Sequence, residues 1–308
     1  MTPRSLKDLT TERANPTSRD FDEKSSFEIA RIINSEDEKV APAVKRALPQ
    51  IARAIDLIAA QMHKGGRLFY VGSGTSGRIG ALDASEIPPT FSTSPKLVQY
   101  IIAGGEKALG SEAEASEDSR DLGRSDMKKR KPGKNDVVIG VAASGRTPFT
   151  IAAIEYARSQ GAQTIALTCN RKTPLERAAH FAIVTEVGPE VLAGSSRMKA
   201  GTAQKMVLNM ITTGAMTRLG YVYGNLMVNL RLKNSKLAER GINILQQAAG
   251  VEPDEARRAL NTAAQDVPLA LVMLKAGVSR PEAARALQAT TGHVRKAIAL
   301  VQKSKRAR

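Results

Sequence analysis

A loop rich in glycine and hydroxyl side chains, residues 72–78, carries the clearest chemical signal in the sequence. The apolar run before it predicts a buried strand, and the helical spacing of apolar residues resumes after Arg78. Such a loop presents backbone N–H groups at the start of a helix, where the helix dipole favours an anion such as phosphate. Eight residues after Arg78 comes the carboxylate of Glu86. A phosphate-binding loop with an acid close by predicts chemistry on a phosphorylated small molecule.

Two other interpretations of this loop stay open on the residues alone. Gly72, Gly74 and Gly77 have the spacing of the dinucleotide-binding motif, and glycine can also serve only the backbone geometry of a tight turn. The loop lacks the Gly-Lys-Ser/Thr ending of a nucleotide P-loop, and Asp83 lies too near it to bind a ribose. The many hydroxyl groups favour a simple phosphate ligand.

Two further loops repeat the pattern of an apolar run, a serine-rich turn and a helix. The first follows residues 137–141 and ends at Pro148, a residue that suits the first position of a helix. The second, residues 194–204, opens an apolar helix. Any single hydroxyl here could be an ordinary helix cap. Together the three loops predict one phosphate site built from backbone N–H groups and from the hydroxyls of Thr75, Ser76, Ser144, Thr147, Ser195 and Ser196.

The alternation of apolar runs with helical patterns predicts an α/β fold with a doubly wound parallel sheet. Helical patterns at 27–34 and 40–62 precede strands expected near 67–71, 97–102, 136–141, 164–168 and 181–184. We predict an N-terminal arm with helices (1–50), a sheet domain (51–232) and a C-terminal helical domain with a basic tail (233–308).

The composition narrows the class of protein. Hydrophobic residues make up 42% of the 308 residues, enough for a substantial core, and no apolar run approaches the ~18 residues of a membrane span. The N-terminus has no apolar core like that of a signal peptide, so we expect a cytoplasmic protein. Cys169 is the only cysteine and the three histidines show no ligand spacing, so neither a disulfide nor a metal site is predicted.

The formal net charge of +16 invites a nucleic-acid interpretation, but its distribution argues against one. Basic residues gather in a short turn at 128–134 and in the tail at 303–308, whereas 106–126 is acidic. Aromatic residues are only 4% of the chain, too few for a stacking platform. Residues 266–277 and 279–301 also fit a DNA-reading helix pair, yet their apolar, alanine-rich composition favours a compact helical domain.

The motifs taken in order resemble those of the N-acetylmuramic acid 6-phosphate etherases, bacterial enzymes with the sugar-isomerase (SIS) fold. The resemblance runs through almost the whole chain and is weakest in the C-terminal helices. The segments that carry it are Thr11-Glu-Arg-Ala-Asn-Pro16, Ile32-Ile-Asn-Ser-Glu-Asp37, Gly72-Ser-Gly-Thr-Ser-Gly-Arg78, Leu82-Asp-Ala-Ser-Glu-Ile-Pro-Pro-Thr90, Ile102-Ala-Gly-Gly105, Ser116-Glu-Asp-Ser-Arg120, Ala142-Ala-Ser-Gly-Arg-Thr-Pro148, Gly194-Ser-Ser-Arg-Met-Lys-Ala-Gly-Thr-Ala-Gln-Lys205 and Gly224-Asn-Leu-Met-Val228.

The resemblance implies a cofactor-free lyase that acts in amino-sugar catabolism and peptidoglycan recycling. Such an enzyme removes D-lactate from N-acetylmuramic acid 6-phosphate by elimination across C2–C3 of the open-chain sugar, and water then adds to give N-acetylglucosamine 6-phosphate. The resemblance makes Glu86 the acid that protonates the departing lactate and Glu117 the base. An α-proton beside an aldehyde needs a base and a leaving alkoxide needs an acid, so two carboxyl groups suit this chemistry. On the residues alone, Glu117 would pass for part of an acidic surface.

The resemblance also implies how the substrate and a second subunit are held. SIS domains commonly pair, and the apolar helix at 197–219 supports a homodimer. The motifs predict that the sugar phosphate is bound by Ser73, Thr75, Ser76, Ser144, Arg146, Thr147, Ser195, Ser196 and Lys199.

Two alternatives use the same fold. One is a regulator that senses sugar phosphates, and the other is an aldose–ketose isomerase, which also needs a base near C2. Release of D-lactate separates the three functions, because a regulator releases none and an isomerase produces a ketose without lactate.

Overall fold

The computed structural model describes residues 9–111, 114–230, 232 and 234–306. The chain forms two compact units, Met1–Ser85 with Pro95–Thr212 and Glu86–Ser94 with Thr213–Arg308. The domain boundaries expected at 50/51 and 232/233 stay predictions. The predicted N-terminal arm belongs to the same unit as the sheet.

The first unit is built on a parallel sheet of five strands in the order β2-β1-β3-β4-β5. The strands are β1 (Leu68–Gly72), β2 (Val98–Ile102), β3 (Val137–Val141), β4 (Gln163–Thr168) and β5 (Phe181–Val184). All four pairings are parallel, which confirms the predicted fold class. The chain order reverses between β1 and β3, and ligands of such sheets bind beyond the carboxyl ends of the strands at this switch point.

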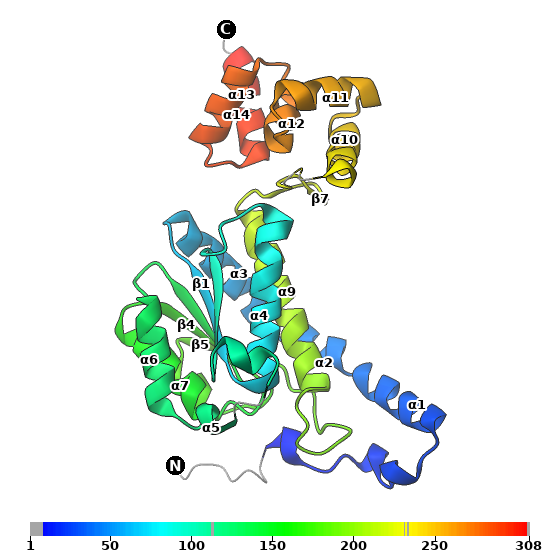
Figure 1. Ribbon diagram of the computed structural model, residues 1–308, viewed down its shortest axis with the longest axis vertical. Coiled ribbons are helices and arrows are strands. Elements are labelled where there is room, and N and C mark those ends of the chain that lie inside the picture. The colour runs from blue at the N-terminus through cyan, green and yellow to red at the C-terminus, as the bar shows by residue number, and fades with distance from the viewer. Residues whose placement is uncertain (1–8, 112–113, 231, 233, 307–308) are drawn as a thin grey trace. The chain divides into compact units, whose positions relative to one another are not determined.

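Helices cover both faces of the sheet, because the side chains of its strands are apolar on both sides. Figure 1 shows α6 (Arg120–Arg130) and α7 (Pro148–Ser159) on one face, with α3 (Leu48–His63), α4 (Gly74–Phe91) and α9 (Lys199–Arg218) on the other. Phe69 and Val138 pack into a buried cluster with Phe149 and Ile154 of α7. The short helices α5 (Glu114–Glu117) and α8 (Pro174–Ala178) complete the sheet region.

In the described part of the N-terminal arm, from residue 9 on, three short 3-10 helices (Thr10–Glu12, Pro16–Ser18 and Phe21–Glu23) precede α1 (Ser26–Asp37). A capping box between Ser25 and Glu28 starts α1, as predicted for a helix near 27–34. The helix predicted over 40–62 is wrong as a single element, since it divides into α2 (Val40–Arg46) and α3. Pro49 near the start of α3 has no N–H with which to continue the preceding helix.

The second unit holds a β-hairpin, β6 (Val222–Tyr223) with β7 (Leu226–Met227), and the helices α10 to α14. The helices span Ser235–Ala249, Pro253–Thr262, Val267–Ala276, Arg280–Ala289 and Val294–Arg306. Their buried core includes Leu245, Leu260, Leu271 and Val294. The predicted helical C-terminal region is therefore confirmed. Within the described ranges, no helix combines the length and apolar character needed to cross a membrane.

Candidate active site at the carboxyl edge of the sheet

The first two predicted loops leave adjacent strands at the switch point of the sheet. Gly72 at the end of β1 pairs in register with Val141 at the end of β3. A Cβ atom on Gly72 would lie 2.9 Å from the Val141 carbonyl oxygen, so a larger residue would push the strand ends apart. The loops that begin at Ser73 and Ala142 therefore start side by side.

The first loop places the start of α4 directly on the strand ends. The Gly77 N–H donates to the Ser73 carbonyl at 3.0 Å, and a Cβ on Gly77 would lie 2.6 Å from Ile102. Within the described part of the chain, the N–H groups of Gly74, Thr75 and Ser76 have no hydrogen-bond acceptor. Free N–H groups in a first helical turn, flanked by half-buried hydroxyls, are suited to an anion, and the phosphate site expected here stays a prediction.

The second loop is a tight turn held by its neighbours. The Arg146 N–H donates to Ser144 Oγ at 3.2 Å, and Gly145 adopts a positive φ of 67°. A Cβ on Gly145 would lie 2.5 Å from Thr173, so the position requires glycine for both its conformation and its space. Ser144, Arg146 and Thr147 stay half-buried at the edge of the sheet, where they could reach a ligand.

The third loop differs from the other two, because an internal carboxylate occupies the start of its helix. Glu190, which is fully buried, accepts hydrogen bonds from the N–H groups of Lys199 (3.0 Å) and Ala200 (2.9 Å). Burial raises the pKa of Glu190, while these two N–H groups oppose the rise. The first N–H groups of α9 are therefore taken, and Ser195 and Ser196 offer only their half-buried side chains and loop backbone.

Lys199 points into the protein. Its ammonium forms an ion pair with Glu36 of α1, and the two side chains are 1% and 3% exposed. Burial would raise the pKa of Glu36, but hydrogen bonds from Lys199, Lys39 and Thr17 outweigh it and lower the pKa to about 2. The direct contact predicted between Lys199 and the sugar phosphate would require this ion pair to open. In the structure, Lys199 fixes the start of α9 against the N-terminal arm.

The arm also ties the loops to one another. Thr10 donates to Asn170 Oδ1 from its N–H and its hydroxyl, at 2.9 and 2.8 Å. Asn170 Nδ2 donates to the Ala143 carbonyl of the second loop at 3.0 Å. The N–H of Gly194, in the third loop, donates to the Thr11 carbonyl at 3.2 Å. Residues 10–11 thus connect the end of β4 with two of the three loops.

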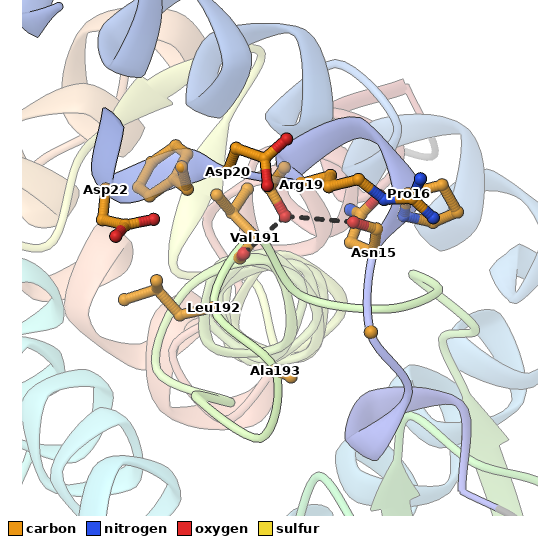
Figure 2. A pocket seen from close by; sticks show the side chains of 11 residues that line it. Asn15, Pro16, Arg19, Asp20, Asp22, Val191, Leu192 and Ala193 are labelled. Carbon is orange, nitrogen blue, oxygen red and sulfur yellow. Dashed lines mark hydrogen bonds between the residues drawn. The ribbon is translucent and has the colours of Figure 1, made fainter. Parts of the chain in front are cut away.

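A cavity of about 450 Å³ lies where the arm crosses the segment before α9. Figure 2 shows Asn15 and Arg19 of the arm beside Val191 and Leu192. Asn15 Nδ2 donates to the Pro189 carbonyl at 3.2 Å, and Ser18 Oγ donates to the Val191 carbonyl at 2.7 Å. These contacts hold the backbone that leads into the third loop.

Side-chain hydrogen bonds at two places join α4 to α9. Ser76 Oγ donates to Gln204 Oε1 at 3.0 Å. One to two turns further along, the buried Asp83 accepts hydrogen bonds from Tyr70 (2.8 Å), Asn209 (2.7 Å) and Thr212 (3.2 Å). Burial raises the pKa of Asp83, and the three donors oppose that rise. The two helices therefore start at the same edge of the sheet and stay fixed to each other and to β1.

Glu117 lies in the first unit, at the end of α5, and is half-buried. The segment before it is held by Arg78 of α4, which donates to the carbonyls of Ala108 (3.1 Å) and Ser111 (3.0 Å). After it, Arg120 forms an ion pair with Glu155 of α7. α5 also contacts α7, the helix that the second loop opens. The fold therefore anchors Glu117 to the helices that follow the first two loops.

Glu86 is exposed on α4, twelve residues after Gly74. Glu86 belongs to the second compact unit, whereas the phosphate-binding loop belongs to the first. The role of Glu86 as the acid stays a prediction.

Four residues that hold the loops and helix starts of the site in place were not predicted. They are Glu36, Glu190, Asn170 and Gln204. Glu36 and Gln204 lie within motifs that carry the resemblance, but their partners are distant in sequence. Glu190 follows no helix-capping spacing, because it binds N–H groups nine and ten residues later.

Comparison with known proteins identifies the fold family of the sheet region. The chain matches the family of the glucokinase regulatory protein N-terminal SIS domain over residues 50–158 and the SIS domain family over 126–214. A solved structure of a protein from E. coli CFT073 is 19% identical, with a TM-score of 0.46, covering 66% of this chain and 97% of that one.

Curated relatives match almost the whole chain. The N-acetylmuramic acid 6-phosphate etherase of Clostridium beijerinckii is 49% identical over 95% of this chain and 96% of its own length. The protein of the same name from Symbiobacterium thermophilum is 55% identical over 89% of this chain and 91% of its own length. The chain therefore belongs to the N-acetylmuramic acid 6-phosphate etherase family.

Proposed function

We propose that the chain cleaves the D-lactyl ether of N-acetylmuramic acid 6-phosphate and yields D-lactate and N-acetylglucosamine 6-phosphate. Membership of the family makes it an etherase, a carbon–oxygen lyase. The observation that carries the proposal is the start of α4, where three free N–H groups lie next to the second loop at the sheet's switch point. In a member of this family, that arrangement suits the 6-phosphate of the substrate.

The phosphate is held in this proposal by the first loop, with hydroxyls from the second and third. Thr75, Ser76 and the N–H groups of the first turn of α4 bind its oxygens. Ser73, Ser144, Arg146, Thr147, Ser195 and Ser196 surround it. Lys199 acts from behind the third loop through its ion pair with Glu36, which fixes the start of α9.

The reaction proceeds by two proton transfers in the elimination and two more in the hydration. Glu117 removes the proton from C2 of the open-chain aldehyde, and the electron pair forms the C2–C3 double bond as the C3–O bond breaks. Glu86 gives its proton to the ether oxygen, so lactate leaves as its hydroxy acid. Water then adds, with its hydroxyl at C3 and a proton at C2, and both carboxyl groups return to their starting states. General acid and base catalysis of this kind contributes ~10²–10⁴-fold each.

A shared active site in a homodimer is part of the proposal, because SIS domains commonly pair and the helix at 197–219 is apolar. In this arrangement Glu86 would serve the phosphate loop of a second copy. Glu117 and the three loops would belong to one subunit and Glu86 to the other. A metal-free enzyme is part of the same proposal, because two carboxyl groups supply the proton transfers that the reaction needs. The proposal also keeps the cytoplasmic location expected from the sequence.

The test is incubation with N-acetylmuramic acid 6-phosphate, with D-lactate and the remaining sugar measured separately. The proposal expects equal amounts of lactate and N-acetylglucosamine 6-phosphate. Binding of the sugar phosphate without lactate would support a regulator, and a ketose without lactate would support an isomerase. Either outcome would overturn the proposed reaction.

A further inference from the structure

The amide of Gln204 uses its oxygen but not its nitrogen in hydrogen bonding, and it contacts the first loop at Ser76. The side chain is 1% exposed, and its Oε1 accepts a hydrogen bond from Ser76 Oγ at 3.0 Å. Its Nε2 is also buried and has no hydrogen-bond partner within the described part of the chain. A buried amide N–H group without an acceptor costs free energy, so its presence next to a binding loop requires an explanation.

The same contact limits what Ser76 can do for a ligand. Ser76 is the third residue of α4, and its N–H is free. Its hydroxyl proton, however, is directed at Gln204 Oε1. A hydroxyl has a single proton, so Ser76 cannot donate to Gln204 and to a phosphate oxygen at the same time.

A primary amide can resolve this conflict because it carries both an acceptor and donors. Rotating the Gln204 amide by half a turn exchanges Oε1 and Nε2 at nearly the same positions. Nε2 would then donate to Ser76 Oγ, and the Ser76 proton would be free. A hydrogen bond from this hydroxyl to a phosphate dianion is charge-assisted and stronger than the bond to the amide that it replaces.

The helix that carries Gln204 is held against α4. One turn before Gln204, a Cβ atom on Gly201 would lie 3.5 Å from Thr75 and Ile79 of α4, an ordinary packing distance. The start of α9 is fixed by Glu190 and by the Lys199–Glu36 pair. Three charged side chains of α4 and α9 are engaged elsewhere or face solvent. Lys199 is paired with Glu36, Arg78 donates to two carbonyls, and Lys205 is exposed.

We propose that Gln204 is a positioning residue of the phosphate site, which turns its amide when a phosphate monoester binds and so frees the Ser76 hydroxyl to donate to it. This inference rests on the proposed phosphate site at the first loop. It adds that the affinity for the phosphate depends on a donor at position 204 that never has to touch the ligand.

The test compares Gln204→Met, which keeps the volume without polar atoms, with Gln204→Glu, which accepts but donates only when protonated. The measurements are KM and kcat for lactate release, and binding of N-acetylglucosamine 6-phosphate. Thermal unfolding confirms that each variant is folded. We expect both to raise KM ~10–100-fold at neutral pH, with kcat changed far less. For Gln204→Glu, the ratio of its KM to that of the wild type should fall as the pH drops and the carboxyl takes up its proton.

A double-mutant cycle separates positioning from packing. If Gln204 acts through Ser76, then Gln204→Met should add little to the KM of Ser76→Ala. An equal cost of Gln204→Met in both backgrounds would overturn the inference, as would a pH-independent KM ratio for Gln204→Glu. An unchanged KM in Ser76→Ala would instead place the phosphate elsewhere and contradict the proposed phosphate site, whereas absence of lactate release from the wild type would contradict the proposed reaction. A raised KM in Ser76→Ala with wild-type behaviour of both Gln204 variants would remove only the role of Gln204.

Discussion

The ammonium of Lys199 and the carboxylate of Glu36 form an ion pair buried inside the first unit, with side chains that are 1% and 3% exposed. The two residues are 163 positions apart, at the start of α9 and near the end of α1. Thr17 of the arm also donates to Glu36, at 2.8 Å. The N-terminal arm and the third loop of the site are therefore parts of one polar cluster.

Breaking this pair from the lysine side should destabilise the first unit. Lys199→Met takes one of the two ammonium partners from a buried carboxylate that keeps Lys39, Thr17 and Asn15, so we expect a loss of ~3 kcal/mol in the free energy of unfolding. Urea denaturation measures it. Lys45→Met is the matched control, because it removes an exposed lysine from α2 of the same unit and should change stability by less than ~0.5 kcal/mol. Equal effects of the two variants would contradict the structural role of the pair.

The contribution of the Glu36 carboxylate to the free energy of unfolding should disappear in acid. Its partners lower the pKa to about 2 from the ordinary value of 4.5, so the folded state holds the proton less tightly than the unfolded state does. An acid of this kind stabilises the fold above its ordinary pKa and loses the contribution as the pH falls toward the folded value. We expect the stability difference between wild type and Glu36→Gln to be full at pH 7 and to shrink between about pH 4.5 and 2. A difference that grows on acidification would contradict the assignment.

The sequence predicts features that depend on neighbouring residues better than those that depend on distant ones. The strand before residue 72, the glycine loop and the start of α4 are local, and each was predicted. The cap supplied by Glu190 and the ion pair of Lys199 arise only when the fold brings separate segments together. The role of Lys199 as a ligand of the substrate stays a prediction; a lysine in a serine-rich loop gives no sign of the internal partner that the structure shows. Glu117 was assigned only through the family resemblance, since a short acidic helix has no local pattern that marks a catalytic base.

The shared site predicts complementation between two inactive variants. Glu86→Gln and Glu117→Gln should each be inactive as homodimers. In a mixed dimer, one site would combine the intact Glu117 of one subunit with the intact Glu86 of the other. Random reassortment makes about half of the dimers mixed, with one working site of two, so about a quarter of the wild-type activity should return.

The control for complementation is each variant denatured and refolded alone, which should regain no activity. Size-exclusion chromatography with light scattering establishes that the refolded chains are dimers. If the mixed sample is as inactive as the separate variants, Glu86 serves its own subunit. A fully active monomer would remove the shared site altogether.

Activity should survive exhaustive chelation. In the proposed reaction, two carboxyl groups move the protons and the first turn of α4 binds the phosphate, so no step calls for a metal. The experiment is dialysis against a chelator followed by measurement of lactate release. A loss of activity that a divalent cation restores would contradict this prediction.

Substitution of the two glutamates should abolish different steps of the reaction if their roles are as proposed. Glu86→Gln keeps the shape of the side chain but has no acidic proton to give, so lactate release should stop while the C2 hydrogen still exchanges with solvent. Glu117→Gln should stop both processes, because the proton at C2 is never removed. Each loss should be ~10²–10⁴-fold, the usual contribution of general acid–base catalysis. The measurement follows deuterium uptake at C2 in D₂O alongside lactate release. Exchange that persists in Glu117→Gln and is lost in Glu86→Gln would reverse the two roles, and near-normal lactate release in both variants would exclude both residues from catalysis.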